Sequence, residues 1–178
     1  MSTDVNAKHV ARCRCGAVEV EARAEPLVVA ACYCDDCQAA GRQIADLFED
    51  GTPPTTTDGG TEFMVFQRDR IACARGAQHL QATRLTEGSK TRRMIAGCCG
   101  APMYMAFDDR RPWVSAFRSA FGAGAPPVEM RICTRFRRAT EPLDDRIPSH
   151  AGYPPAMMLR ILGAALAMLF RRPVGALP

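Results

Sequence analysis

The stretch Cys32-Tyr33-Cys34-Asp35-Asp36-Cys37 places three thiols within six residues. It directly follows Leu27–Ala31, an apolar run after Pro26 that predicts a strand. Short Cys-x-Cys and Cys-x-x-Cys spacings let one tight turn direct two sulfur atoms at a single point, which is the arrangement that zinc uses. The stretch therefore predicts a metal-binding turn at the end of a strand.

Two further cysteine clusters lie on either side of this stretch. Cys13-Arg14-Cys15-Gly16 precedes it, and Cys98-Cys99-Gly100 follows it much later in the chain. Gly16 and Gly100 suit tight turns, because glycine accepts positive φ and leaves room for backbone amides beside sulfur. The three clusters hold seven of the nine cysteines, which favours metal binding over isolated buried thiols.

The redox context also favours a metal over disulfides. The N-terminal residues 1–12 are polar and mixed in charge, unlike a secretory signal, so we expect a cytoplasmic protein with reduced thiols. An odd number of cysteines leaves at least one unpaired in any disulfide scheme.

The number of sulfur atoms bears on the kind of site. Seven exceed one tetrahedral site and fall one short of two closed sites. This suggests one closed structural zinc with four ligands and a second zinc with three, so one or two Zn²⁺ per chain. A three-ligand zinc keeps a position open for water or substrate, as expected for catalysis.

Other candidate residues have a structural interpretation that we favour. Cys73 and Cys133 stand alone in apolar stretches and are expected to be small core residues. Asp35 and Asp36 are expected to cap the metal-binding turn rather than act as acid or base. Tyr33 either shapes a pocket or packs in the core.

The remaining chain up to residue 140 reads as a mainly β domain. Alternating residues predict a strand at Ala17–Ala22, and Gln38–Leu47 is compatible with a short helix. Gly51–Gly60 is rich in Gly, Pro and Thr and predicts a loop. The pattern over Glu62–Phe107 predicts a β-meander with candidate strands at Phe63–Gln67, Ile71–Ala74, His79–Leu85, Thr91–Ala96 and Met103–Phe107. A further candidate strand, Trp113–Phe117, could extend this sheet. Val128–Phe136 is ambiguous between strand and helix.

Residues 141–178 are predicted to form a C-terminal extension with an apolar helix at Pro155–Phe170, which Pro173 stops. Such a helix is roughly 24 Å long, shorter than the roughly 30 Å core of a bilayer. We therefore favour packing on the domain or on a second subunit, in a homo-oligomer. An interfacial membrane contact stays open, because the helix is apolar on nearly every side and ends in Arg171-Arg172.

Charge and aromatic content argue against a nucleic-acid partner. The formal net charge is +4, and the arginine pairs are scattered along the chain rather than gathered in a basic stripe. Aromatic residues make up only 7% of the chain, so no stacking platform for single strands is evident.

The order Cys-x-Cys-Gly, strand, Cys-x-Cys-x-x-Cys and a late Cys-Gly resembles the glutathione-dependent formaldehyde-activating enzyme family, which includes centromere protein V. The resemblance covers roughly Arg12–Phe107. It implies an Mss4-like zinc-binding antiparallel β fold with two zinc sites.

The resemblance also implies a division of the cysteines. Cys13, Cys15 and Cys99 would belong to a structural zinc, whereas Cys32, Cys34 and Cys37 would form the three-thiolate catalytic site. The family usually has Cys-x-x-Cys-Gly in the last cluster, where this chain has Ala96 and, instead, Cys98 next to Cys99. Neighbours on a strand point to opposite faces. Three alternatives follow: Cys98 completes the site in a distorted turn, the structural zinc is weak or absent, or the two cysteines form a vicinal disulfide.

For function, the resemblance implies a zinc-dependent carbon–sulfur lyase step that joins formaldehyde and glutathione. We expect a small thiol substrate, such as a glutathione–aldehyde adduct, whose carboxylates could meet Arg84, Arg92 or Arg93; a solvated strand face is the commoner role for each arginine. The alternative is a non-catalytic zinc-binding interaction module, oligomeric or associated with a membrane surface through its C-terminal helix.

Overall fold

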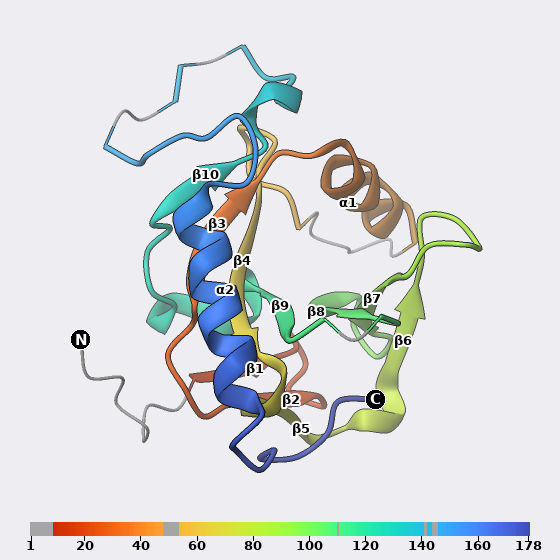
Figure 1. Ribbon diagram of the computed structural model, residues 1–178. Helices are drawn as coiled ribbons and strands as arrows, with labels where there is room; N and C mark the ends of the chain where they lie inside the picture. Colours follow the sequence, from red (N-terminus) through yellow and green to blue (C-terminus); the bar gives the residue numbers. More distant parts are fainter. Residues whose placement is uncertain (1–8, 48–53, 110, 141, 144–145) are drawn as a thin grey trace.

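The computed structural model describes residues 9–47, 54–109, 111–140, 142–143 and 146–178, and most of its regular structure is β-sheet (Figure 1). A three-stranded sheet has the order β1-β2-β5, formed by His9–Arg12, Glu19–Ala22 and Ile71–Arg75. A seven-stranded sheet has the order β10-β3-β4-β9-β8-β7-β6. In chain order its strands are β3 (Val28–Cys32), β4 (Thr61–Gln67), β6 (Leu80–Thr83), β7 (Thr91–Ala96), β8 (Ala101–Phe107), β9 (Trp113–Phe117) and β10 (Met130–Ile132).

The predicted fold class is confirmed: the chain is mainly β, with antiparallel sheets and a C-terminal helix. One strand pair departs from the antiparallel pattern, because β10 runs parallel to β3 and pairs Ile132 with Cys32. The stretch that was ambiguous between strand and helix thus contributes a short strand, followed by a single 3₁₀ turn at Thr134–Phe136. Other 3₁₀ turns lie at Arg68–Arg70, Ala77–His79 and Arg118–Gly124.

The predicted meander over Glu62–Phe107 is wrong in its pairing. Strands β6 to β9 do follow one another as neighbours, but β4 lies between β3 and β9, and β5 leaves the large sheet to pair with β2. The 3₁₀ turn at Arg68–Arg70 lies between β4 and β5 and redirects the chain. Alternation of apolar residues locates a strand but does not choose its partner.

Two hydrophobic cores lie on opposite faces of the seven-stranded sheet. Successive residues of β4 alternate between them: Phe63 and Val65 pack in one core, Met64 and Phe66 in the other. Such alternation follows from the period of two along a strand. The small sheet packs on the Phe66 side, and both helices pack on the Phe63 side.

Helix α1 (Asp35–Leu47) starts three residues earlier than the predicted helix. Asp35 and Asp36 occupy its first turn, where their negative charges favour the N-terminal end of the helix dipole. Gly41 gives the helix room, because a Cβ there would lie 2.5 Å from Cγ2 of Thr55. The predicted loop at 51–60 lies partly outside the described residues; its described part ends in bends and turns before β4.

Helix α2 (Pro155–Met168) lies across β3 and β4 (Figure 1). It buries Met157, Ile161 and Ala164 against the core. Its outer side leaves large apolar residues exposed: Met158, Leu159, Leu162 and Leu166, followed by Leu169 and Phe170. None of the described helices is long and apolar enough to cross a membrane.

Residues after α2 return to the small sheet. The Val174 N–H donates to the Asp69 carbonyl at 2.9 Å, and the Cys73 N–H donates to the Ala176 carbonyl at 3.1 Å. Leu177 packs against the core that contains Phe66. The predicted boundary between 1–140 and 141–178 falls beside residue 141, outside the described residues, so the division into two parts stays a prediction.

Candidate metal centres and cavity

Cys13, Cys15, Cys98 and Cys99 form a first sulfur cluster, with all four sulfur atoms within 4.8 Å of one another. Two turns supply it: the one after β1 carries Cys13 and Cys15, and the one between β7 and β8 carries Cys98 and Cys99. The Gly16 and Gly100 backbones have φ of 76° and 71°, as expected for glycines in tight turns.

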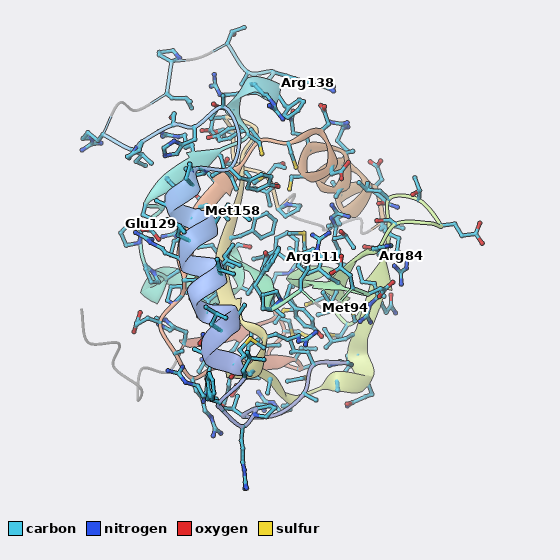
Figure 2. The ribbon with its side chains drawn as sticks, viewed as in Figure 1. Arg84, Met94, Arg111, Glu129, Arg138 and Met158 are labelled. Carbon is cyan, nitrogen blue, oxygen red and sulfur yellow. The ribbon has the colours of Figure 1, made fainter. Side chains whose placement is uncertain are left out.

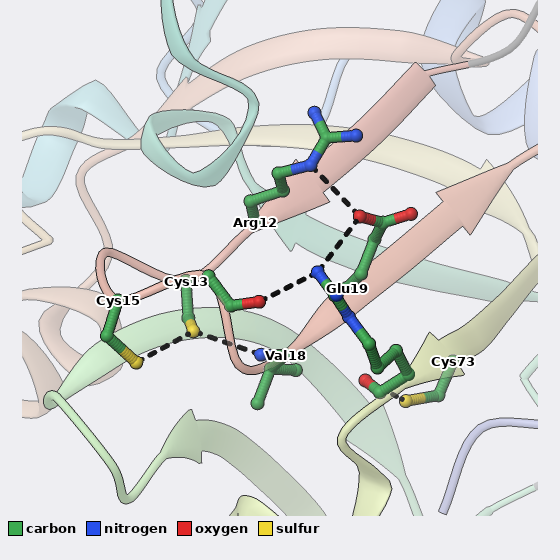
Figure 3. Close-up of polar contacts among 8 residues, drawn as sticks. Arg12, Cys13, Cys15, Val18, Glu19 and Cys73 are labelled. Carbon is green, nitrogen blue, oxygen red and sulfur yellow. Dashed lines mark hydrogen bonds and ion pairs between the residues drawn. The ribbon is translucent and has the colours of Figure 1, made fainter.

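The sulfur separations fit a tetrahedral zinc. Cys13 Sγ lies 3.6 Å from Cys15 Sγ and 3.9 Å from Cys98 Sγ, and the latter two sulfurs are 3.3 Å apart. Four thiolates at ordinary zinc–sulfur distances are separated by about 3.8 Å. A buried Cys13 whose sulfur accepts the Val18 N–H at 3.1 Å adds the backbone support typical of structural sites (Figure 3).

The neighbouring cysteines Cys98 and Cys99 both reach this cluster because the chain turns between β7 and β8. The N–H groups of Cys99 and Gly100 both donate to the Ala96 carbonyl, at 3.1 and 2.8 Å. The structure has a distorted turn that brings both sulfurs together, and both thiols are free rather than joined in a vicinal disulfide. Zinc ligation by Cys98 stays a prediction. Ala96 itself is buried in the core.

The environment of the first cluster supports charge on one of its sulfurs. The backbone N–H of Ala17, aided by the Cys98 and Cys13 thiols, lowers the pKa of Cys15 to about 7. Although Cys98 is exposed, desolvation by the groups around its sulfur, and then the neighbouring Cys15 thiol, raise its pKa to about 12. A metal bound at this cluster would need thiolates and would therefore displace the protons that the thiols hold.

Cys32, Cys34 and Cys37 form a second cluster whose three sulfurs also lie within 4.8 Å of one another. Cys32 ends β3, Cys34 precedes α1, and Cys37 sits in the first turn of that helix. Hydrogen bonds from the Cys32 and Cys37 thiols, with further ones from the Cys37 and Asp36 N–H groups, lower the pKa of Cys34 to about 3. This cluster packs in the Phe63 core, on the opposite face of the large sheet from Cys13 and Cys99.

The second cluster opens into a cavity of about 330 Å³. The cavity lies between the sheet and α2, with apolar walls that include Phe63, Phe107, Trp113, Met157 and Ile161. Its polar lining includes Asp36, Thr91, Arg93, Arg111, Ser115 and Tyr153. In the view of Figure 2, Met158 lies on α2 and Arg111 between that helix and strands β7 and β8.

The three arginines expected as candidates for carboxylate binding are separated by the structure. Arg93 is buried and lines the cavity. Arg84 and Arg92 instead pair with Asp108, at 2.7 and 2.9 Å. The difference follows from the strand: Arg92 and Arg93 are neighbours on β7 and so face opposite sides of the sheet.

The acidic and aromatic residues of the central stretch have structural contacts. Asp35 pairs with Arg138 at 3.0 Å on the surface, while the Asp36 carbonyl accepts from Arg93. Tyr33 is buried and its hydroxyl donates to Asp58 Oδ2 at 2.6 Å, outside the lining of the cavity.

Cys133 and Tyr153 lie beside the second cluster, and the sequence interpretation did not identify either as a site residue. Cys133 is buried as expected, but its thiol also interacts with the Cys32 thiol and the Tyr153 hydroxyl. It lies there because β10 pairs with β3, a pairing that no local pattern predicts. Cys73, expected in the core, is only half-buried on the edge strand β5, and its thiol donates to the Arg75 carbonyl at 3.3 Å.

Comparison with known proteins gives a family match over the segment that contains five of the clustered cysteines. Residues 8–47 match the family of glutathione-dependent formaldehyde-activating enzymes. A crystal structure of a Rhodobacter sphaeroides protein is similar to this chain with a TM-score of 0.46 and 16% identity, over 66% of this chain and 91% of that chain. No curated protein matches the chain. The matched segment holds Cys13, Cys15 and all of Cys32, Cys34 and Cys37. The resemblance to the glutathione-dependent formaldehyde-activating enzyme family is therefore confirmed over residues 8–47.

Proposed function

We propose that the chain is a zinc-dependent carbon–sulfur lyase-type protein that acts on a thiol–aldehyde adduct, with glutathione and formaldehyde as the first pair to test. The observation that carries this proposal is the second cluster. Its three sulfur atoms lie within 4.8 Å of one another, and the three cysteines line a cavity of about 330 Å³. Three protein ligands with an open side are the arrangement of catalytic rather than structural zinc.

The donor set fits zinc, because three thiolates within 4.8 Å match its preference for sulfur. Bound by Cys32, Cys34 and Cys37, a zinc ion would supply an electrophilic centre that favours the thiolate form of a substrate thiol. In the synthetic direction, the substrate sulfur forms a bond to the aldehyde carbon, the carbonyl π bond breaks, and the thiol proton ends on the aldehyde oxygen. The reverse step breaks the same carbon–sulfur bond.

The chain's own residues hold and enclose the reactants. Hydrogen bonds from the Cys32 and Cys37 thiols, with the N–H groups of Cys37 and Asp36 at the start of α1, lower the pKa of Cys34 and so favour the thiolate that a metal would need. Phe107, Trp113 and Met157 form apolar walls that exclude water from the reacting atoms. The Tyr153 hydroxyl, which interacts with the Cys133 thiol, lies at the same cavity.

The test measures exchange between glutathione, formaldehyde and their adduct by exchange NMR, with zinc-loaded protein. We expect the wild type to accelerate exchange, Cys34→Ser to abolish the acceleration, and Cys73→Ser to retain it. Cys73 is a matched control because it lies outside both clusters. Equal acceleration by the wild type and Cys34→Ser would contradict the proposal.

A second candidate function, a non-catalytic zinc module attached to an anionic membrane surface, is favoured by α2. Its large apolar residues remain exposed at helical spacing, and Leu169 and Phe170 are 74% and 88% exposed. The exposed Arg171 and Arg172 follow directly, so apolar and cationic groups coincide at one end of the helix. This combination suits the interface of an anionic bilayer.

Flotation with vesicles tests this candidate. We expect binding to vesicles containing phosphatidylserine, weaker binding to pure phosphatidylcholine, and loss of binding in Leu166→Glu. Thr86→Glu adds the same charge on an exposed turn outside α2 and should bind as the wild type does. A dimer in solution that Leu166→Glu dissociates, without vesicle binding, would assign the face to a second copy and contradict this candidate.

A further inference from the structure

Arg93 is a buried arginine with an incomplete set of partners. Its side chain projects from β7 and is only 3% exposed. Nη2 donates to the Asp36 carbonyl at 3.3 Å, but the buried Nη1 has no hydrogen-bond partner. Among the residues that the structure describes, no carboxylate lies within ion-pair distance of this guanidinium. A buried guanidinium without a counter-charge and with an unpaired N–H group costs free energy, unless a bound ligand supplies the missing partner.

Two other arginines close to Arg93 form ion pairs with carboxylates of the protein. Arg111, at the cavity, pairs with Asp109 at 2.9 Å and stacks over Phe107, with its guanidinium 4.5 Å from the ring centre. Arg92, on the opposite side of β7, forms an ion pair with Asp108 at 2.9 Å, although its buried Nε makes no well-aligned hydrogen bond. Of these three guanidinium groups, that of Arg93 is the one without an ion pair among the described residues, and it lines the cavity.

Arg93 also lies beside the second cluster. Its Nη2 donates to the carbonyl of Asp36, the residue before Cys37, and Arg93 and Cys37 line the same cavity. An anionic group bound at Arg93 would thus lie close to a sulfur bound at the cluster. A carboxylate is the natural partner of a guanidinium, because its oxygens match the fork of N–H donors.

We propose that Arg93 is an anion-binding residue of this cavity, so that its ligand is a thiol carrying a carboxylate a few bonds from the sulfur. This inference rests on the proposed function, since the thiol is placed at the second cluster. It adds that the carboxylate, and not only the sulfur, selects the substrate.

Calorimetric titration of the zinc-loaded protein tests the inference with three probes. β-Mercaptopropionate has both groups, β-mercaptopropionamide has the same shape without the charge, and β-(methylthio)propionate has the charge without a free thiol. Zinc content is measured before and after each titration, so that removal of the metal by a thiol is detected. The variants are Arg93→Met, Arg93→Lys and, as the matched arginine on the other side of β7, Arg92→Met.

We expect the wild type and Arg92→Met to bind the mercaptocarboxylate about tenfold or more tightly than the amide, as for a hydrogen bond to a charged group. Arg93→Met should remove this preference while leaving the affinity for the amide and the zinc content unchanged. Arg93→Lys should keep part of the preference, because it keeps the charge but not the fork.

The inference is overturned if Arg93→Met keeps the preference. It is equally overturned if that variant loses zinc and weakens both thiols alike, since Arg93 would then only balance the charge of the cluster. Binding of the thioether carboxylate distinguishes a failure of this inference from a failure of the proposed function. Arg93-dependent binding of the thioether, without binding of either thiol, would uphold the anion site and contradict the thiol chemistry.

Discussion

Cys133 is the residue on which the open character of the second cluster depends. Its thiol interacts with that of Cys32, yet Cys133 lies outside the group of three sulfurs within 4.8 Å of one another. Its backbone adopts φ of 58°, a left-handed conformation that is uncommon for a residue with a Cβ. If its sulfur closed the site, the cluster would be structural rather than catalytic.

We predict that Cys133→Ala keeps the zinc content and the exchange activity of the wild type, because three thiolates already define the site. Metal analysis and exchange NMR on the variant measure both. Loss of one zinc per chain from this variant would show that Cys133 is a fourth ligand and would favour the non-catalytic module.

Tyr33 gives a pH-dependent prediction. Burial and the nearby Asp58 carboxylate raise the pKa of Tyr33 from its ordinary value of 10 to about 12. Since the folded pKa lies above the unfolded one, the stabilisation is complete below pH 10 and is lost as the pH rises toward 12. We expect Tyr33→Phe to lower the free energy of unfolding by about 1 kcal/mol at pH 7 and to flatten its decline at alkaline pH.

Urea unfolding at several pH values compares this variant with the wild type. Tyr104 and Tyr153 are present in both proteins, so the difference isolates Tyr33. Parallel declines above pH 10 would contradict the assignment.

Among the elements, α2 joins the core through one side only. Ile161 is 5% exposed, whereas its neighbour Leu162 is 56% exposed. We predict that Ile161→Ala lowers the free energy of unfolding by about 2–4 kcal/mol, because it leaves a cavity in the core. Leu162→Ala should change it by less than ~0.5 kcal/mol. Denaturant unfolding measures both, and similar losses for the two variants would mean that the outer face of α2 is covered in solution.

The elements also show what the sequence can predict. Alternation and turn residues located most strands, and Pro155 and Pro173 bracketed α2. The partner of each strand was not predictable, because pairing depends on contacts between distant segments, as for β5 in the small sheet and β10 beside β3.

The same limit applies to the candidate site. The seven clustered cysteines could be identified as candidate metal ligands from the sequence, because residues separated by such short spacings are also close in space. Arg93, Cys133 and Tyr153 join the cavity from β7 and from the segments after β10, and nothing in their local sequence indicates this.

At the scale of the whole molecule, the last residues cover the edge of the small sheet. Strand β5 is an edge strand, and residues 174–178 pack along it. A Cβ on Gly175 would lie 2.7 Å from the Cβ of Ala72, so the tail approaches the sheet closely. Exposed edges promote pairing between molecules.

We predict that deleting residues 174–178 lowers the free energy of unfolding by about 2–4 kcal/mol, through lost hydrogen bonds and apolar burial. It should also increase aggregation on heating. Calorimetry and light scattering measure these effects, with Arg171→Ala, an exposed change just before the tail, as the control. Unchanged stability of the shortened chain would mean that the tail does not hold this edge.

The whole account depends on two separate metal sites on opposite faces of the large sheet. Zinc analysis of wild type, Cys34→Ser and Cys73→Ser, purified without added chelator, tests this most directly. We predict two zinc ions per chain in the wild type and Cys73→Ser, and one in Cys34→Ser, because only the second cluster loses a ligand. Equal zinc content in the wild type and Cys34→Ser would show that Cys32, Cys34 and Cys37 hold no metal, and would contradict the account.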